Sequence, residues 1–110
     1  MELYHNVFSL ASHHDNLSLS VLSVVPEKPK AVVQLAHGMC EHKERYLPFM
    51  RFLAENGYAA FLNDHRGHGE SVRDAADLGY FYDGGARALI DDMHLLTAHI
   101  KSSYPSLPIA

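Results

Sequence analysis

The sequence predicts an α/β domain, with a mostly parallel sheet, flanking helices and an antiparallel hairpin at the N-terminus. Three observations lead to this class. The segments from Ala31 to Ala36 and from Tyr58 to Leu62 are almost entirely apolar, which is typical of parallel strands covered on both faces. An apolar pattern of helical period follows each of them. Strands that alternate with helices favour a parallel sheet joined by crossover connections.

The hairpin is predicted from two segments near the N-terminus. Residues 2–9 mix Leu, Tyr, Val and Phe and are expected to form an edge strand. Strict alternation of Leu and Ser begins at residue 17, and it predicts a half-exposed strand that continues to about residue 25. Between them, residues 12–16 have the composition of a turn.

Two helices are predicted from apolar residues at helical spacing, and both apolar faces are expected in the core. The first carries Tyr46, Phe49, Met50 and Leu53, with Pro48 in its first turn and Asn56-Gly57 at its end. The second covers residues 86–101 and carries Ala86, Leu89, Ile90, Met93, Leu96 and Ile100. It should end before Pro105, because the residue before proline disfavours helix. Residues 107–110 predict the start of a further strand.

Composition limits the class of protein. With 110 residues, 47% hydrophobic and 20% charged, the chain fits one small globular unit spanning residues 1–110. The net charge of −4 comes without a run of like charges, so we expect no nucleic-acid partner. The single Cys40 excludes an internal disulfide. No signal peptide and no apolar stretch of membrane-spanning length is found, so the sequence predicts no transmembrane segment and a cytoplasmic location.

His37-Gly38-Met39 opens the loop after the first buried strand. A glycine there lets the backbone turn sharply and leaves the next N–H unpaired, although Gly38 could serve only a tight turn and His37 could simply pack. Glu41 and Arg45 are four residues apart and can pair to hold this loop, with His42 joining them. The alternative is a solvated ion pair worth under ~1 kcal/mol.

The loop after the second buried strand, residues 64–71, contains Ser71 and two histidines. Ser71 lacks the G-x-S-x-G context of a nucleophile, so a turn or capping hydroxyl is expected. His65 and His68 lie in a Gly-rich loop without a helical pattern, and Cys40 stands alone. We therefore expect no metal site and no cysteine nucleophile. No G-x-G-x-x-G opens a helix, so no cofactor is expected.

Together, His37-Gly38-x-x-Glu41-His42-x-x-Arg45-Tyr46 and Asp64-His-Arg-Gly-His-Gly-Glu-Ser71 resemble the N-terminal part of an α/β-hydrolase of the monoacylglycerol lipase and lysophospholipase (serine aminopeptidase S33-like) family. The resemblance runs from about residue 31 to the end and implies an incomplete α/β-hydrolase fold. It implies that the Met39 backbone N–H is an oxyanion-hole donor on a loop shaped by His37 and Gly38. Supporting, non-chemical roles are implied for Glu41, His42, Arg45, Asp64, Arg66, Gly67, His68 and Gly69.

Members of this family carry their triad in the order Ser, Asp or Glu, His, and all three lie beyond the region that this sequence resembles. The resemblance therefore implies the N-terminal piece of a serine hydrolase that cleaves a carboxylic ester, of a lysophospholipid or a monoacylglycerol, and that is inactive by itself. The alternative is a non-catalytic α/β module, or a truncated product that binds a partner chain. Peptidases, thioesterases and carboxylesterases share much of the two motifs.

The resemblance also places the strand from Ala31 to Ala36 between the 58–62 strand and a strand that follows Pro108. With the sequence ending at Ala110, this apolar strand is expected to present an unpaired edge, which is a template for another chain. We expect it to pair with the remainder of the same protein or with a second copy.

Overall fold

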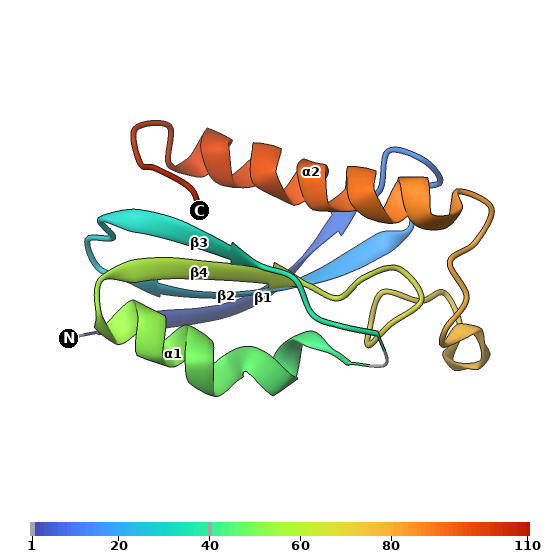
Figure 1. Ribbon diagram of the computed structural model, residues 1–110, viewed down its shortest axis with the longest axis horizontal. Helices are drawn as coiled ribbons and strands as arrows, with labels where there is room; N and C mark the ends of the chain where they lie inside the picture. The colour runs from blue at the N-terminus through green and yellow to red at the C-terminus, as the bar shows by residue number, and fades with distance from the viewer. Residues whose placement is uncertain (1, 40) are drawn as a thin grey trace.

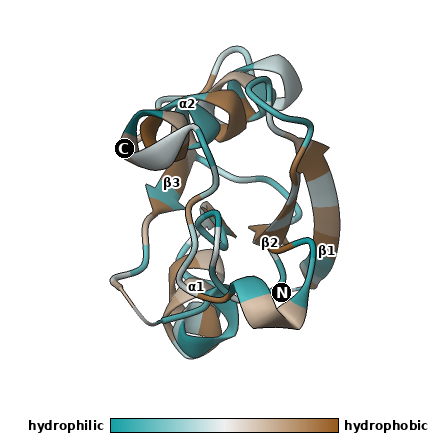
Figure 2. Ribbon diagram, turned by 90° about the vertical axis from the view of Figure 1, so that its right-hand side faces the viewer, coloured by the Kyte–Doolittle hydropathy of each residue, from teal (hydrophilic) through white to brown (hydrophobic). Residues whose placement is uncertain are grey.

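The computed structural model describes residues 2–39 and 41–110. One four-stranded sheet lies between two helices, α1 (Leu47–Glu55) on one face and α2 (Gly85–Ser103) on the other (Figure 1). In Figure 2, turned by 90°, the two helices lie on opposite sides of the strands. The predicted α/β class is confirmed.

The strands are β1 (Leu3–Ala11), β2 (Ser18–Pro26), β3 (Ala31–Leu35) and β4 (Tyr58–Asn63). Their order across the sheet is β1-β2-β4-β3. β1 and β2 form the predicted antiparallel hairpin, β2 is also antiparallel to β4, and β3 runs parallel to β4. The sheet is therefore mixed, and its parallel part lies at the β3 edge.

β2 is not the half-exposed strand that its alternation predicts. All residues from Leu19 to Val24 are buried, because β2 lies inside the sheet and both of its faces are covered. Ser20 and Ser23 are small enough to be enclosed, and the Ser20 N–H donates to Ser71 Oγ at 2.9 Å. The prediction was wrong because a serine does not require solvent when the strand is covered on both faces.

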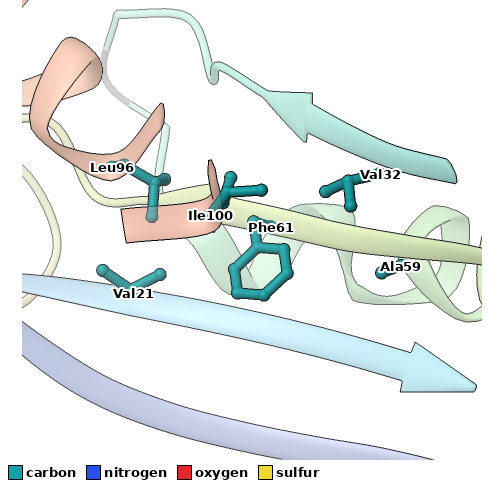
Figure 3. Close-up of a cluster of buried hydrophobic side chains, with 6 residues drawn as sticks. All are labelled: Val21, Val32, Ala59, Phe61, Leu96 and Ile100. Atoms are coloured by element: carbon teal, nitrogen blue, oxygen red, sulfur yellow. The ribbon is translucent and has the colours of Figure 1, made fainter. Parts of the chain in front are cut away.

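The core has one apolar cluster on each face of the sheet. Since successive strand residues point to opposite faces, Val21 belongs to one cluster and Leu22 to the other. The cluster under α2 is drawn in Figure 3 and consists of Val21, Val32, Ala59, Phe61, Leu96 and Ile100. The cluster under α1 consists of Leu22, Val24, Met50, Ala54, Ala60 and Leu62.

The helices exist where predicted, but their buried faces are turned. Phe49 is 48% and Ile90 is 47% exposed, so their assignment to the core was wrong. α1 instead buries Met50 and Ala54, and it follows a 3₁₀ turn, η1 (Lys43–Tyr46). The residues that α2 buries are Ala88, Asp92, Leu96 and Ile100. A charged residue lies within that stripe, and apolar periodicity cannot find it.

The β3 edge is partly paired by the last residues of the chain. The Val32 N–H donates to Pro108 O at 2.9 Å, the Ala110 N–H donates to Val32 O at 2.9 Å, and the Gln34 N–H donates to Ala110 O at 3.0 Å. Val32 and Ile109 form a parallel bridge, which confirms the predicted start of a strand. Val32 is fully buried, so the expectation that it lies on an unpaired edge was wrong. Among the described residues, no helix combines the length and apolar character of a membrane span.

Candidate functional site

The two sequence motifs lie at the same edge of the sheet. β3 and β4 are parallel neighbours, with Leu35 beside Leu62, so the loops that follow them start side by side. This is where open α/β sheets place their binding sites. The 3₁₀ turn η2 (Ala75–Asp77) is the one short element of the long connection from β4 to α2 among the described residues.

His37 and His65 join the two loops by reciprocal hydrogen bonds. The His65 N–H donates to His37 Nε2 at 2.8 Å, and His65 Nε2–H donates to His37 O at 2.9 Å. The His37 ring must then carry its proton on Nδ1, which donates to Gly38 O at 2.7 Å. Both rings are buried, with centroids 4.1 Å apart. The start of the Gly38 loop is thus fixed against the β4 loop.

The rings of His65 and His68 are packed within the fold and are not arranged to bind a metal ion. Burial, followed by the nearby His37, lowers the pKa of His65 below its ordinary value of 6.5, and its Nδ1 has no hydrogen-bond partner in the described structure. His68 is buried, and its Nδ1 lies 3.1 Å from Arg66 O, to which it can donate. These contacts support the shape of the loop.

Glu41 holds the middle of the loop. Its Oε1 accepts from the Gly38 N–H at 2.6 Å and from the Tyr46 hydroxyl at 2.8 Å. The Tyr46 hydrogen bond, and then the Gly38 one, lower the pKa of Glu41 below its ordinary value of 4.5. Gly38 does not have a positive φ; a Cβ there would lie 2.9 Å from Glu41 Oε1. An added Cβ would therefore press on the end of the Glu41 side chain rather than strain the backbone.

Arg45 and His42 behave differently. Arg45 Nε lies 3.1 Å from Glu41 Oε2, so these two residues pair as their spacing allows. His42 does not join that pair: its Nδ1 lies 3.3 Å from Glu44 Oε1, and both side chains are about half exposed. The prediction of a three-residue network was therefore wrong for His42.

The backbone N–H of Met39 lies in the middle of this loop and is open to a ligand. Met39 is 65% exposed, and no acceptor for its N–H is found among the residues that the structure describes. The preceding amide is occupied by Glu41. Cys40 lies outside the described residues.

Asp64 joins the end of this loop to the β4 loop. Its Oδ1 accepts from the Lys43 N–H at 2.7 Å, and its Oδ2 accepts from Lys43 Nζ at 2.9 Å and from the Glu70 N–H at 3.0 Å. A Cβ on Gly69, which has a φ of +51°, would lie 2.4 Å from this carboxylate. A Cβ on Gly67 would lie 2.3 Å from Tyr80 O. The two glycines of the motif therefore make room for these groups.

Lys43 is the residue of this site that the motifs did not reveal. It is fully buried, and its Nζ lies among the carboxylates of Glu44, Asp64 and Glu70, whose nearest oxygens lie within 4.8 Å of one another. Such a trio could hold a metal ion, but the ammonium donates to all three. The one available signal was a lysine directly after the Glu41-His42 pair.

Arg66 is a second buried cation, on the other side of the β4 loop. Its five N–H groups are all used: Nε donates to Asp92 at 2.8 Å, and the other nitrogens donate to Asp15, Ser12 and Phe81 O. Burial alone would lower its pKa, but the hydrogen bonds to Asp15 and Asp92 raise it instead. Arg66 thus joins the hairpin turn to α2.

Ser71 is a structural hydroxyl. It is fully buried, its Oγ donates to Asp64 O at 2.8 Å, and it accepts from the Ser20 N–H. A hydroxyl with both roles occupied and no exposure has no route to a substrate. A surface hollow of about 460 Å³ lies between the two loops, and its lining includes Glu41, His68 and Leu78 but not Ser71.

Comparisons with known proteins agree with this geometry. Residues 27–110 match the family model described as serine aminopeptidase, S33. The chain belongs to this family. It is 33% identical over 90 residues to a monoglyceride lipase homolog of Monkeypox virus, and 32% identical over 88 residues to the human monoglyceride lipase. Each match uses 74% of this chain, but 28% and 25% of those proteins.

A solved structure shows the same fold. A thermostable carboxyl esterase from Bacillus coagulans, crystallised with glycerol, superposes with a TM-score of 0.85 at 30% identity. The superposition covers 99% of this chain and 35% of the esterase. The described residues therefore form part of an α/β-hydrolase fold, and the chain spans about a quarter to a third of the length of these similar proteins.

Proposed function

We propose that the protein to which this chain belongs hydrolyses carboxylic esters through an acyl-serine intermediate, and that the Met39 N–H is one of its two oxyanion donors. The observation that carries this proposal is the state of the Met39 amide. It is unbonded within the described structure, while the loop around it is held by His65 at its start, Glu41 in its middle and Asp64 at its end. Preorganised donors of this kind stabilise developing negative charge.

Each supporting residue has a stated role in this proposal. His37 and Gly38 form the loop, Glu41 fixes Gly38, and Arg45 orients Glu41. The β4 loop, with Asp64, Arg66, Gly67, His68 and Gly69, forms the floor beneath it. The nucleophile is supplied by residues outside this sequence, since no G-x-S-x-G occurs in it. The 110 residues alone are therefore expected to be inactive.

The proposed substrates are monoacylglycerols or lysophospholipids. Support comes from the names of the two lipases that this chain resembles, and from the apolar Leu78 and Met39 at the rim of the loop, 61% and 65% exposed. The family description also names an aminopeptidase. Parallel assays of the full-length protein on a monoacylglycerol and on an amino-acid p-nitroanilide separate the two substrate classes.

Substitutions in the loop test the donor. In the full-length protein, Gly38→Ala should lower kcat on a p-nitrophenyl ester by about 10²-fold, the usual effect of losing an oxyanion donor, because the new Cβ displaces Glu41. Met39→Ala is the matched control and should be mild, since the donor is backbone. The assignment fails if Met39→Ala abolishes turnover while Gly38→Ala retains it. No ester or peptide hydrolysis by the full-length protein would favour the non-catalytic module.

We also propose that the outer edge of β3 pairs with the continuation of the strand that begins at Pro108. The bonds from Val32 and Gln34 to this segment support that partner over a second copy of the chain. The N–H groups of β3 that face this edge are those of Val32 and Gln34 and, by strand alternation, Ala36. In the full-length protein, amide exchange at Gln34 and Ala36 should then be slow, and sedimentation should show no association through this edge.

A further inference from the structure

The surroundings of Lys43 resemble those of a bound cation. Its Nζ lies 2.7 Å from Glu44 Oε2, 2.7 Å from Glu70 Oε1 and 2.9 Å from Asp64 Oδ2. An ammonium has three N–H donors, and here each has one carboxylate. The Lys43 and Asp64 side chains are fully buried, while Glu44 and Glu70 remain 47% and 69% exposed. We call these four residues the Lys43 cage.

Lys43 keeps its positive charge at neutral pH. Burial alone would lower the pKa of Lys43, but its hydrogen bonds to Glu44, Glu70 and Asp64 outweigh this, and the pKa lies above its ordinary value of 10.5. Without the ammonium, three carboxylates within 4.8 Å would face one another. Like charges at that distance repel, more strongly when partly buried.

The cage is joined directly to the loop that carries Met39. Lys43 is bound to Asp64 twice, through Nζ and through its backbone N–H. This double attachment fixes the end of the loop at the first residue of η1, four residues after Met39. The first fixed point is His37, on the other side of Met39. Movement of residue 43 away from Asp64 would therefore shift the Met39 amide.

We propose that Lys43 is a positioning residue whose ammonium fills a cation site among three carboxylates and thereby holds the Met39 N–H in place. This inference rests on the proposed function for its effect on turnover. The requirement of the cage for a small cation does not depend on that function. Removal of the side chain should leave a site for a hard divalent cation, which prefers carboxylate oxygens.

The experiment compares Lys43→Ala, Lys43→Arg and Lys28→Ala in the full-length protein, where Lys28 is an exposed matched control. Lys43→Ala should lower kcat on a p-nitrophenyl ester by about tenfold or more with KM little changed, the pattern of an interaction felt in the transition state. Lys43→Arg should recover part of kcat. Calcium chloride should raise both kcat and the unfolding midpoint of Lys43→Ala, and should leave wild type and Lys28→Ala unchanged.

A second readout is independent of hydrolysis. The amide resonance of Met39 should shift in Lys43→Ala and return toward its wild-type position with calcium. If wild type shows no turnover, the proposed function fails, while this calcium-dependent return still supports the cage. If Lys43→Ala folds only with calcium, the cage is also supported. Wild-type kcat and an unshifted Met39 amide in Lys43→Ala, or a shift that neither calcium nor Lys43→Arg reverses, overturns the proposal.

Discussion

Lys43 and Arg66 are both fully buried cations beside the same loop, yet they are enclosed differently. Arg66 donates all five of its N–H groups, and its partner Asp92 is 2% exposed. Lys43 shares its charge with Glu44 and Glu70, which reach solvent. Arg66 therefore joins distant parts of the fold in a closed cluster, whereas Lys43 holds one loop within an open cluster. Equal burial of two charges does not imply equal roles.

Arg66→Met should have the largest effect on stability. It leaves Asp92 buried without its partner, and breaking a buried ion pair costs about 3–5 kcal/mol. Urea unfolding of the full-length protein measures this loss. Arg51→Met, at an exposed position, serves as the control and should stay within about 0.5 kcal/mol. A loss below about 1 kcal/mol for Arg66→Met would show that the cluster is not what joins α2 to the hairpin turn.

Gly69→Ala should come next. The residue has a positive φ, which costs a side chain about 1–2 kcal/mol, and the new Cβ would also collide with the Asp64 carboxylate. Gly79→Ala is a close control, because Gly79 has a φ of +87° but no atom within 4 Å of an added Cβ. The difference between their unfolding free energies isolates the contact with Asp64. Equal losses would mean that the contact is relieved by a small shift.

Lys43→Met should lower the free energy of unfolding by about 1–3 kcal/mol, the usual cost of leaving a buried polar group unpaired. This loss is smaller than the one expected for Arg66→Met. Glu44 and Glu70 can turn to solvent, so only Asp64 loses its partner without compensation. Chemical unfolding of both variants, at the same salt concentration, compares them directly. A loss equal to that of Arg66→Met would remove the distinction between the open and the closed cluster.

The smallest expected effect is a dependence on pH. The pKa of His65 is lowered in the folded state, so below pH 6.5 the unfolded chain binds this proton first. Stability should therefore fall as pH decreases from 6.5 toward the folded pKa, by at most about 1.4 kcal/mol per pH unit for one proton. His65→Gln should flatten this part of the profile, and exposed His13→Gln should not. Parallel profiles for wild type and His65→Gln would exclude His65 as the source.

The predictions from sequence succeeded where the signal is local. Strand β4, the end of α2 before Pro105 and the glycine-rich loop after β4 each follow from neighbouring residues. Gly69 is also part of a local sequence pattern. The need for glycine there, which is room for the Asp64 carboxylate, becomes visible only in the folded structure.

The failures involve residues whose environment is set from far away in the sequence. Asp92 can be buried because its charge is paired with Arg66. Lys43 can be buried because its charge is paired with Asp64, which directly follows β4. The enclosed Ser20 donates its backbone N–H to Ser71, 51 positions away. Phe49 fits a helical period but lies at the edge of the apolar face of α1. The small Ala54 is the residue that packs in the cluster between α1 and the sheet. A charge or a serine that finds a partner looks no different in sequence from one that remains in water.

The hydrogen bond from Ser12 to Asp92 joins residues 80 positions apart, and this has a consequence for the order of folding. Such long-range contacts form late, because the chain must close a large loop before it gains any energy from them. During synthesis, the hairpin turn and Arg66 leave the ribosome well before Asp92. Until α2 emerges, Arg66 must remain hydrated or pair with Asp15 alone. Closure of the cluster therefore reports that the N-terminal hairpin, the β4 loop and α2 have reached their places together.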